Sequence, residues 1–204
     1  MIDGVIKYHF EFHPSEALDP SLWGDIEAVR GRLFALGLIG VTEDGIGFGN
    51  ISQQKGGDSF VITGTQTGDR PLLSAEHYAL VEEYDDREFY LKSSGKIKPS
   101  SEALTHGTLY RLSPKIGAVI HVHSLALWAF MLKENYLKTE KVEYGSIEMI
   151  DEVNRIFSSL DPLTHPKFVM AGHEEGIMVF GENLQKAEFT LYELIAALMK
   201  KLSL

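Results

Sequence analysis

The most constraining feature of the sequence is a short apolar run that ends in two histidines, AVIHVH at residues 118–123. A run rich in Val and Ile is typical of a buried strand. Because side chains alternate between the two faces of a strand, His121 and His123 lie on one face and Val122 on the other. Two such imidazoles can converge on one ion at bonds of about 2.0–2.1 Å. We therefore interpret the pair as metal ligands in preference to core or surface histidines.

A third ligand has to come from elsewhere in the chain. The sequence has no cysteine, which excludes disulfides and thiolate sites and leaves imidazole and carboxylate groups to hold a metal. His173 is favoured because the glycines of MAGHEEGIMVFG predict a strand–turn–strand element from which a histidine can emerge. We interpret the other histidines as packing or exposed side chains: His9, His13, His77, His106 and His165.

The natural acid or base is Glu102, at the start of the segment SEALTHGTLY, where a helix N-terminus stabilises an ionised carboxylate. A glutamate in a first helical turn often only helps to cap the helix, and Ser101 is the predicted cap. The stretches EDGIGFGNIS, ITGTQTGD and PSS offer hydroxyls and backbone N–H groups that can cradle a phosphate without cations. Each stretch alone is weak, because Gly-Asn and Gly-Asp also mark ordinary turns.

The remaining sequence alternates between strand and helix patterns, which predicts a single layered α/β domain over residues 1–204. Residues 1–18 are expected to form an N-terminal strand extension. The pattern leaves open whether the sheet is parallel or mixed. The predicted strands cover 5–12, 59–63, 87–92, 117–124, 167–171 and 176–181, and the predicted helices cover 20–37, 74–84, 101–112, 125–134, 147–159 and the segment from 184 onwards.

Charge and hydropathy narrow the classes of partner. The formal net charge is −10 and no dense run of Lys or Arg occurs, so nucleic acid is not an expected partner. No apolar run approaches the roughly 18 residues that a membrane span needs. The N-terminal sequence lacks the basic and apolar regions of a signal peptide. We therefore expect a cytoplasmic protein, which the absence of cysteine also suits.

Taken in order, several segments resemble the signature segments of the class II aldolase/adducin family: GFGNIS, ITGTQTG, PSSEALTHGTLY, AVIHVHS and AGHEEGIMVFGENLQKA. The family includes L-fuculose-1-phosphate aldolase, L-ribulose-5-phosphate 4-epimerase and methylthioribulose-1-phosphate dehydratase. The resemblance spans roughly residues 25–200, and the ordered set is specific where each motif alone is not. It implies a three-layer α/β/α domain with a mainly antiparallel or mixed sheet, and a homotetramer with active sites between subunits.

The resemblance also assigns roles to single residues. It implies zinc, with Mn²⁺, Co²⁺ or Fe²⁺ as alternatives, on His121, His123 and His173. It makes Glu102 the catalytic carboxylate. The implied contacts to the phosphate of a small sugar phosphate are Asn50, Thr63, Gly64, Ser100 and Ser101.

The activity that follows from these roles is that of a lyase. The leading hypothesis is reversible aldol cleavage of a small ketose phosphate through a zinc-stabilised enediolate. A dehydratase or 4-epimerase acting on a ribulose phosphate would use the same metal site. A non-catalytic scaffold, as in adducin, is the alternative from another class, and the complete set of histidines and Glu102 argues against it.

The sequence departs from the family pattern in several places. Residues 173–176 read His-Glu-Glu-Gly, which adds Glu174 and Glu175 near the metal where the family has His-Gly. The ITGTQTG turn is longer than the common phosphate turn, and the N-terminal strand is an addition. We expect no C-terminal tail with a catalytic tyrosine. This leaves three tyrosines open as proton donors: Tyr110, Tyr136 and Tyr144.

Overall fold

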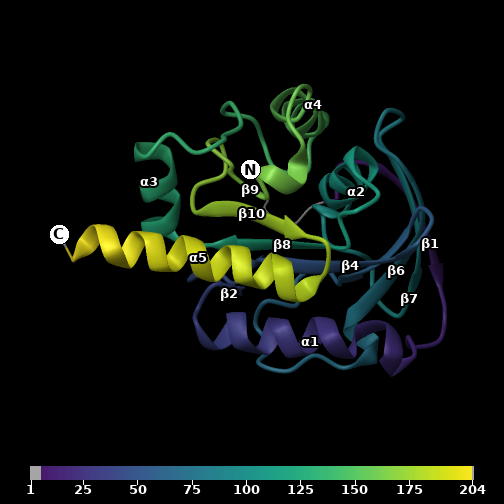
Figure 1. Cartoon of the computed structure of the whole chain (residues 1–204). Coiled ribbons are helices and arrows are strands. Elements are labelled where there is room, and N and C mark those ends of the chain that lie inside the picture. Colours follow the sequence, from purple (N-terminus) through teal and green to yellow (C-terminus); the bar gives the residue numbers. More distant parts are fainter. Residues whose placement is uncertain (1–5, 204) are drawn as a thin grey trace.

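The computed structural model describes residues 6–203, which form a sheet with helices packed on both of its faces (Figure 1). The main sheet has eight strands in the order β1-β7-β6-β5-β4-β8-β10-β9. Its strands are β1 His9–Pro14, β4 Asn50–Gly56, β5 Ser59–Thr63, β6 Tyr78–Asp85, β7 Tyr90–Gly95, β8 Ala118–His123, β9 Lys167–Val169 and β10 Gly176–Gly181. The edge strand β1 pairs in parallel with β7, and every other neighbouring pair in this sheet is antiparallel.

The helices divide between the two faces of the sheet. They are α1 Pro20–Ala35, α2 Ala103–Leu112, α3 Leu125–Lys133, α4 Ile147–Ile156 and α5 Leu184–Leu202. One core, with Phe60 and Val119 from the sheet, is covered by α2 and α4. The other core, with the adjacent strand residues Val61 and Ile120, is covered by α1, α3 and α5. Figure 1 shows α2 and α4 on one side of the sheet and α1 on the other. The expected three-layer α/β/α fold with a mixed sheet is confirmed.

The predicted helix at 74–84 is wrong. Ala75–His77 form one turn of 3₁₀ helix, and the chain then enters β6, which pairs with β5 on one side and β7 on the other. The helix-start signal is real but local, because the Ser74 N–H donates to His77 Nδ1 at 3.0 Å. Tyr78 and Ala79 are fully buried in the sheet. Burial between two strands therefore overrides the helical preference of this segment.

The start of α2 also differs from the prediction. Ser101 does not cap the helix: Glu102 occupies the N-cap position, and the Ser100 hydroxyl accepts a hydrogen bond from the Glu102 N–H at 3.3 Å. The strand expected at 87–92 begins later, because Asp85 accepts hydrogen bonds from the N–H groups of Arg87 and Glu88 in a turn.

A glycine-rich stretch that we expected to form a turn contains strands. Gly40–Val41 (β2) and Gly47–Phe48 (β3) pair as a small separate hairpin, and β4 follows directly. The first strand covers 9–14 where 5–12 was predicted, and residues 1–5 lie outside the described residues. The assignment of 1–204 to one domain, with 1–18 as an extension, stays a prediction. Within residues 6–203, no helix has the length and apolar character needed to cross a membrane.

Candidate active site

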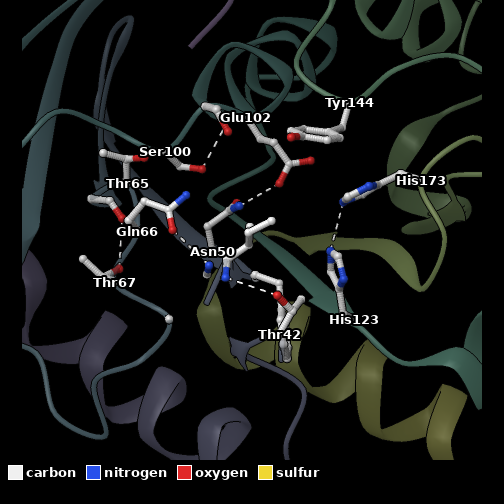
Figure 2. A pocket seen from close by; sticks show the side chains of 17 residues that line it. Thr42, Asn50, Thr65, Gln66, Thr67, Ser100, Glu102, His123, Tyr144 and His173 are labelled. Carbon is white, nitrogen blue, oxygen red and sulfur yellow. Dashed lines mark hydrogen bonds between the residues drawn. The ribbon is translucent and has the colours of Figure 1, made fainter. Parts of the chain in front are cut away.

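The histidines at the end of β8 and the histidine of the β9–β10 turn converge on one point. Strand β8 lies between β4 and β10, and His121 is paired with both strands, whereas His123 is paired with β10 and donates its N–H to the Leu38 carbonyl oxygen at 3.0 Å. His121 Nε2 lies 3.1 Å from His123 Nε2. Figure 2 shows His123 facing His173, and their Nε2 atoms lie 3.0 Å apart. A tetrahedral ion with bonds of about 2.0–2.1 Å needs its ligand atoms about 3.3–3.4 Å apart. Small side-chain shifts would therefore seat a divalent metal among these nitrogens.

The glycines around His173 explain how the turn presents its imidazole. A side chain at Gly176 would place its Cβ 2.6 Å from His173 Cδ2, and one at Gly172 would place its Cβ 2.4 Å from the Val142 carbonyl oxygen. The His173 N–H donates to the Met170 carbonyl oxygen at 3.1 Å, which closes the turn. The turn therefore needs small residues on either side of the ligand.

The imidazoles of His121 and His123 are held neutral, and that of His121 is also oriented by a hydrogen bond. His121 Nδ1 lies 3.1 Å from the Ile177 carbonyl oxygen, which can only accept, so Nδ1 carries the proton and Nε2 keeps its lone pair. Burial lowers the pKa of His121 to about 4. Burial, and then the neighbouring His121 and His173, also hold the pKa of His123 far below its ordinary value. Neutral imidazoles are the form that binds metal.

His123 has two further neighbours. Its ring stacks on Phe48 with a centroid distance of 5.0 Å and an interplanar angle of 23°. Its Nδ1 lies 3.9 Å from the carboxylate of Glu175, a residue with a φ of 70°. Phe48 belongs to the β2–β3 hairpin, which was not predicted, so its contact with His123 could not be expected from the sequence pattern.

Glu102 lies beside the histidines and is almost completely buried, at 4% exposure. Its Oε2 accepts a hydrogen bond from Asn50 Nδ2 at 2.8 Å and lies 3.2 Å from His121 Nε2. Its Oε1 is buried and has no hydrogen-bond partner among residues 6–203. Burial raises the pKa of the Glu102 carboxyl above its ordinary value, and the His173 and Asn50 side chains offset this only in part. A carboxyl group of this kind suits proton transfer.

A cavity extends from these residues to the glycine-rich loops (Figure 2). The predicted phosphate contacts that line it are Asn50, Gly64, Ser100 and Ser101. Thr63 has a different position, because its hydroxyl accepts a hydrogen bond from the Ile51 N–H within the sheet at 3.2 Å. In the part of the chain that the structure describes, no lysine or arginine lines the cavity.

The loop after β5 supplies lining residues that the sequence reasoning did not single out. Thr65, Gln66, Thr67 and Gly68 all face the cavity. Gln66 has a φ of 55°, and its Oε1 accepts a hydrogen bond from the Gly47 N–H at 3.0 Å, which ties the loop to the β2–β3 hairpin. The repeated Gly and Thr of ITGTQTG were the signal, but the length of the loop concealed which residues reach the cavity.

The three tyrosines that the sequence suggested as proton donors lie in different surroundings. Tyr144 lines the cavity, and its ring lies 4.5 Å from that of His173. Tyr110 is buried, with its hydroxyl 2.6 Å from that of Ser52, which also lies 2.7 Å from His106 Nδ1. Tyr136 packs near Phe130 in the other core.

Comparison with known proteins shows what this chain is similar to. Residues 39–200 match the family model described as the class II aldolase and adducin N-terminal domain. A methylthioribulose-1-phosphate dehydratase from Acidiphilium cryptum is 32% identical over 127 residues, which cover 58% of this chain and 55% of that protein. The chain therefore matches about half the length of this relative.

Solved structures show the same fold at low sequence identity. YgbL from Klebsiella pneumoniae has a TM-score of 0.70 and 18% identity, over 90% of this chain and 89% of that chain. L-fuculose-1-phosphate aldolase from Thermus thermophilus has a TM-score of 0.64 and 22% identity, over 91% and 94%. A sugar-phosphate aldolase from Thermotoga maritima has a TM-score of 0.64 and 18% identity, over 90% and 96%.

Proposed function

The chain belongs to the class II aldolase and adducin family, and on that premise we propose that it is a metal-dependent lyase that reversibly cleaves a small ketose phosphate. The observation that carries the proposal is the convergence of three imidazole nitrogens beside the buried carboxylate of Glu102. A scaffold domain has no need for a buried carboxyl oxygen without a hydrogen-bond partner among residues 6–203 next to three converging imidazoles. A catalytic metal site accounts for both features.

The donor set fits a divalent metal. His121, His123 and His173 would hold the ion, and three protein ligands leave coordination positions open, as catalytic zinc sites require. Bound there, the ion would act as a Lewis acid that polarises the carbonyl and hydroxyl oxygens of the substrate. Zinc is the proposed ion, and Mn²⁺, Co²⁺ and Fe²⁺ are alternatives because imidazole ligands also accept them.

The remaining residues of the cavity bind and orient the substrate. We assign the phosphate to the hydroxyls of Ser100 and Ser101 and to the backbone N–H groups of residues 66–68, with Asn50 at the edge of this group. A phosphate held there directs the carbon chain of the ketose toward the histidines at the other end of the same cavity. Thr63 lies next to this loop and supports it from within the sheet.

Glu102 and Tyr144 are the proposed proton carriers. Glu102 Oε1 is the atom with a free lone pair, so it exchanges the proton with the substrate carbon that gains electron density when the carbon–carbon bond breaks. Tyr144 is the tyrosine that lines the cavity. We assign to it the exchange of a proton with the substrate hydroxyl group whose oxygen becomes the aldehyde oxygen. The Asn50 amide holds the other Glu102 oxygen in place.

Dehydration of a ribulose phosphate is the second candidate function. The 32% identity to methylthioribulose-1-phosphate dehydratase favours it, although the match covers only 55% of that protein. The two reactions have different products. Aldol cleavage yields a triose phosphate and an aldehyde, whereas dehydration keeps the carbon skeleton intact, so mass analysis of the products distinguishes them.

The first test is elemental analysis of the protein and of a His123→Ala variant, both prepared without a polyhistidine tag. We expect about one zinc per chain in the wild-type protein and loss of zinc in the variant. Screening of phosphorylated ketoses follows. Absence of metal from the wild-type protein, with no activity after zinc is added, would refute the proposal and favour a scaffold function.

A homotetramer with active sites between subunits, located in the cytoplasm, completes the proposal. Exposed apolar side chains on one side of α5 support self-association, since Phe189 is 58% and Met199 62% exposed. Light scattering of the purified protein measures the mass of the assembly, and a monomer at micromolar concentration would contradict this part.

A further inference from the structure

The loop that lines the phosphate end of the cavity is held from behind by a buried arginine. Arg30 of α1 is 1% exposed, and its Nη2 donates to the carbonyl oxygens of Thr67 at 3.0 Å and Arg70 at 2.6 Å. Its Nη1 is buried and has no hydrogen-bond partner among residues 6–203. Burying a guanidinium is costly, so a guanidinium used to fix two loop carbonyls indicates that the conformation of this loop matters.

The contact with Thr67 determines which way the next amide faces. In a planar trans peptide, the C=O and the following N–H point in opposite directions. Because the Thr67 carbonyl is directed at Arg30, the Gly68 N–H is directed away from it, and Gly68 lines the cavity. A Cβ at Gly68 would lie 1.9 Å from the Gly40 carbonyl oxygen, so no side chain can occupy this position and cover the amide.

Two further hydrogen bonds, one within the loop and one to Glu27 of α1, hold the segment around Thr67. The Thr67 hydroxyl donates to the Gly64 carbonyl oxygen at 2.9 Å, which folds the loop on itself. Glu27, one turn before Arg30 on α1, accepts a hydrogen bond from the Leu73 N–H at 3.0 Å. The same residue lies 3.9 Å from Arg30 Nη1 and offsets part of its charge. Arg30 therefore acts mainly by orienting the loop.

We infer that Arg30 is a positioning residue for an anion site, which it forms by holding the Thr67–Gly68 peptide with the Gly68 N–H toward the cavity. The ligand class is a phosphate, either inorganic or the phosphate of a sugar phosphate, and the latter rests on the proposed function. Arg30 lies outside residues 39–200, the part that matches the family model. The role is therefore assigned from the contacts in this chain.

The test is calorimetric titration of inorganic phosphate into the full-length protein as purified. Arg30→Met keeps most of the side-chain volume and removes all donors, and we expect its Kd for phosphate to rise about tenfold or more. Arg30→Lys keeps the charge but cannot hold both carbonyls in the same way, and we expect a rise of about threefold. If a ketose phosphate is turned over, KM rises in the same order while kcat changes little.

Arg32→Met is the matched control. Arg32 lies on the same helix, but its guanidinium binds Glu188 of α5 at 2.6 and 2.8 Å and does not contact the loop. We expect its phosphate Kd to equal that of the wild-type protein. The zinc content should be unchanged in every variant, because none of the substitutions touches the histidines.

Three results would overturn the inference: phosphate affinity of a folded Arg30→Met within about twofold of wild type, an equal loss in Arg32→Met, or no phosphate binding by the wild-type protein. If Arg30→Met does not fold, Arg30→Lys decides, and wild-type affinity in that variant refutes the role. The proposed function fails by a different result, namely a wild-type protein without metal or turnover.

Discussion

Replacing Glu102 with glutamine tests the site through stability as well as turnover. The carboxyl group is 4% exposed, and only one of its oxygens has a hydrogen-bond partner among residues 6–203. Burial raises its pKa, so the surroundings of Glu102 in the metal-free protein disfavour the ionised form of the carboxyl group. Glu102→Gln keeps the shape and the hydrogen bond from Asn50 and removes the charge.

The expected gain follows from the cost of burying a carboxylate with one oxygen that has no hydrogen-bond partner among residues 6–203. Relieving it should raise the free energy of unfolding of the metal-free protein by about 2 kcal/mol. For a chain of 204 residues, this corresponds to a rise in Tm of about 4–8 °C. With zinc bound the gain should disappear, because the carboxylate then lies near a cation. Turnover should fall by at least about 10²-fold.

The pH dependence has a definite sign. The folded pKa of Glu102 is raised above the unfolded value of about 4.3, so its contribution to stability is complete below that pH and is lost as the pH rises through the folded pKa. The advantage of glutamine therefore grows from acid to neutral pH. Thermal unfolding followed by circular dichroism, with and without zinc, measures it. A metal-free variant less stable than wild type near neutral pH, or an equal gain with zinc bound, would refute the reasoning.

Three further predictions address the surroundings of the site. Because the pKa of His121 in the folded protein is about 4, the free energy of unfolding of the metal-free protein should fall by about 2 kcal/mol between pH 6.5 and about pH 5, where the imidazole takes up a proton in the unfolded chain. Urea unfolding measures this fall, which should be smaller in His121→Gln. Arg111→Met removes two hydrogen bonds of 2.6 Å to the buried Asp86 and should destabilise the fold by about 3 kcal/mol in the same assay, with recovery when Asp86→Asn is added. Lys7 Nζ donates to the Tyr144 carbonyl oxygen at 2.7 Å and lies 4.2 Å from the centroid of the Tyr144 ring, so it holds this tyrosine in place. Lys7→Met should therefore lower kcat about tenfold at unchanged zinc content, whereas Lys7→Arg should keep most of the activity. Equal rates in the two variants would contradict this prediction.

The cluster of three histidines could be predicted in part from the sequence because the placement of its members is local. Alternation along a strand puts His121 and His123 on one face whatever the rest of the fold does. The glycines next to His173 identify a turn that only small residues allow. What the pattern could not supply is that the β9–β10 turn reaches the end of β8, because this depends on the pairing of β8 with β10.

The conformation of the loop at residues 64–68 and the strand β6 could not be predicted in the same way, because contacts between residues far apart in the sequence determine both. Residues 78–85 have a helical preference, and only their pairing with β5 and β7 makes them a strand. The carbonyl of Thr67 faces Arg30, a residue 37 positions earlier in the chain. No spacing rule connects a helix arginine to a glycine-rich turn.

The acidity of the protein is compatible with an anionic substrate because the proposed site binds the anion through oriented backbone N–H groups and hydroxyls and does not depend on cationic side chains. The formal net charge is −10, and no cationic side chain lines the cavity among the described residues. Binding must then come from backbone N–H groups and hydroxyls, whose dipoles act only over short distances. Such groups bind an anion only when they are held in the correct direction, and this requires the Arg30 contacts behind the loop. Strand β8, which lies between β4 and β10, carries two of the histidines at the other end of the proposed site, so in this proposal the distance between the two ends would select among substrates of different length.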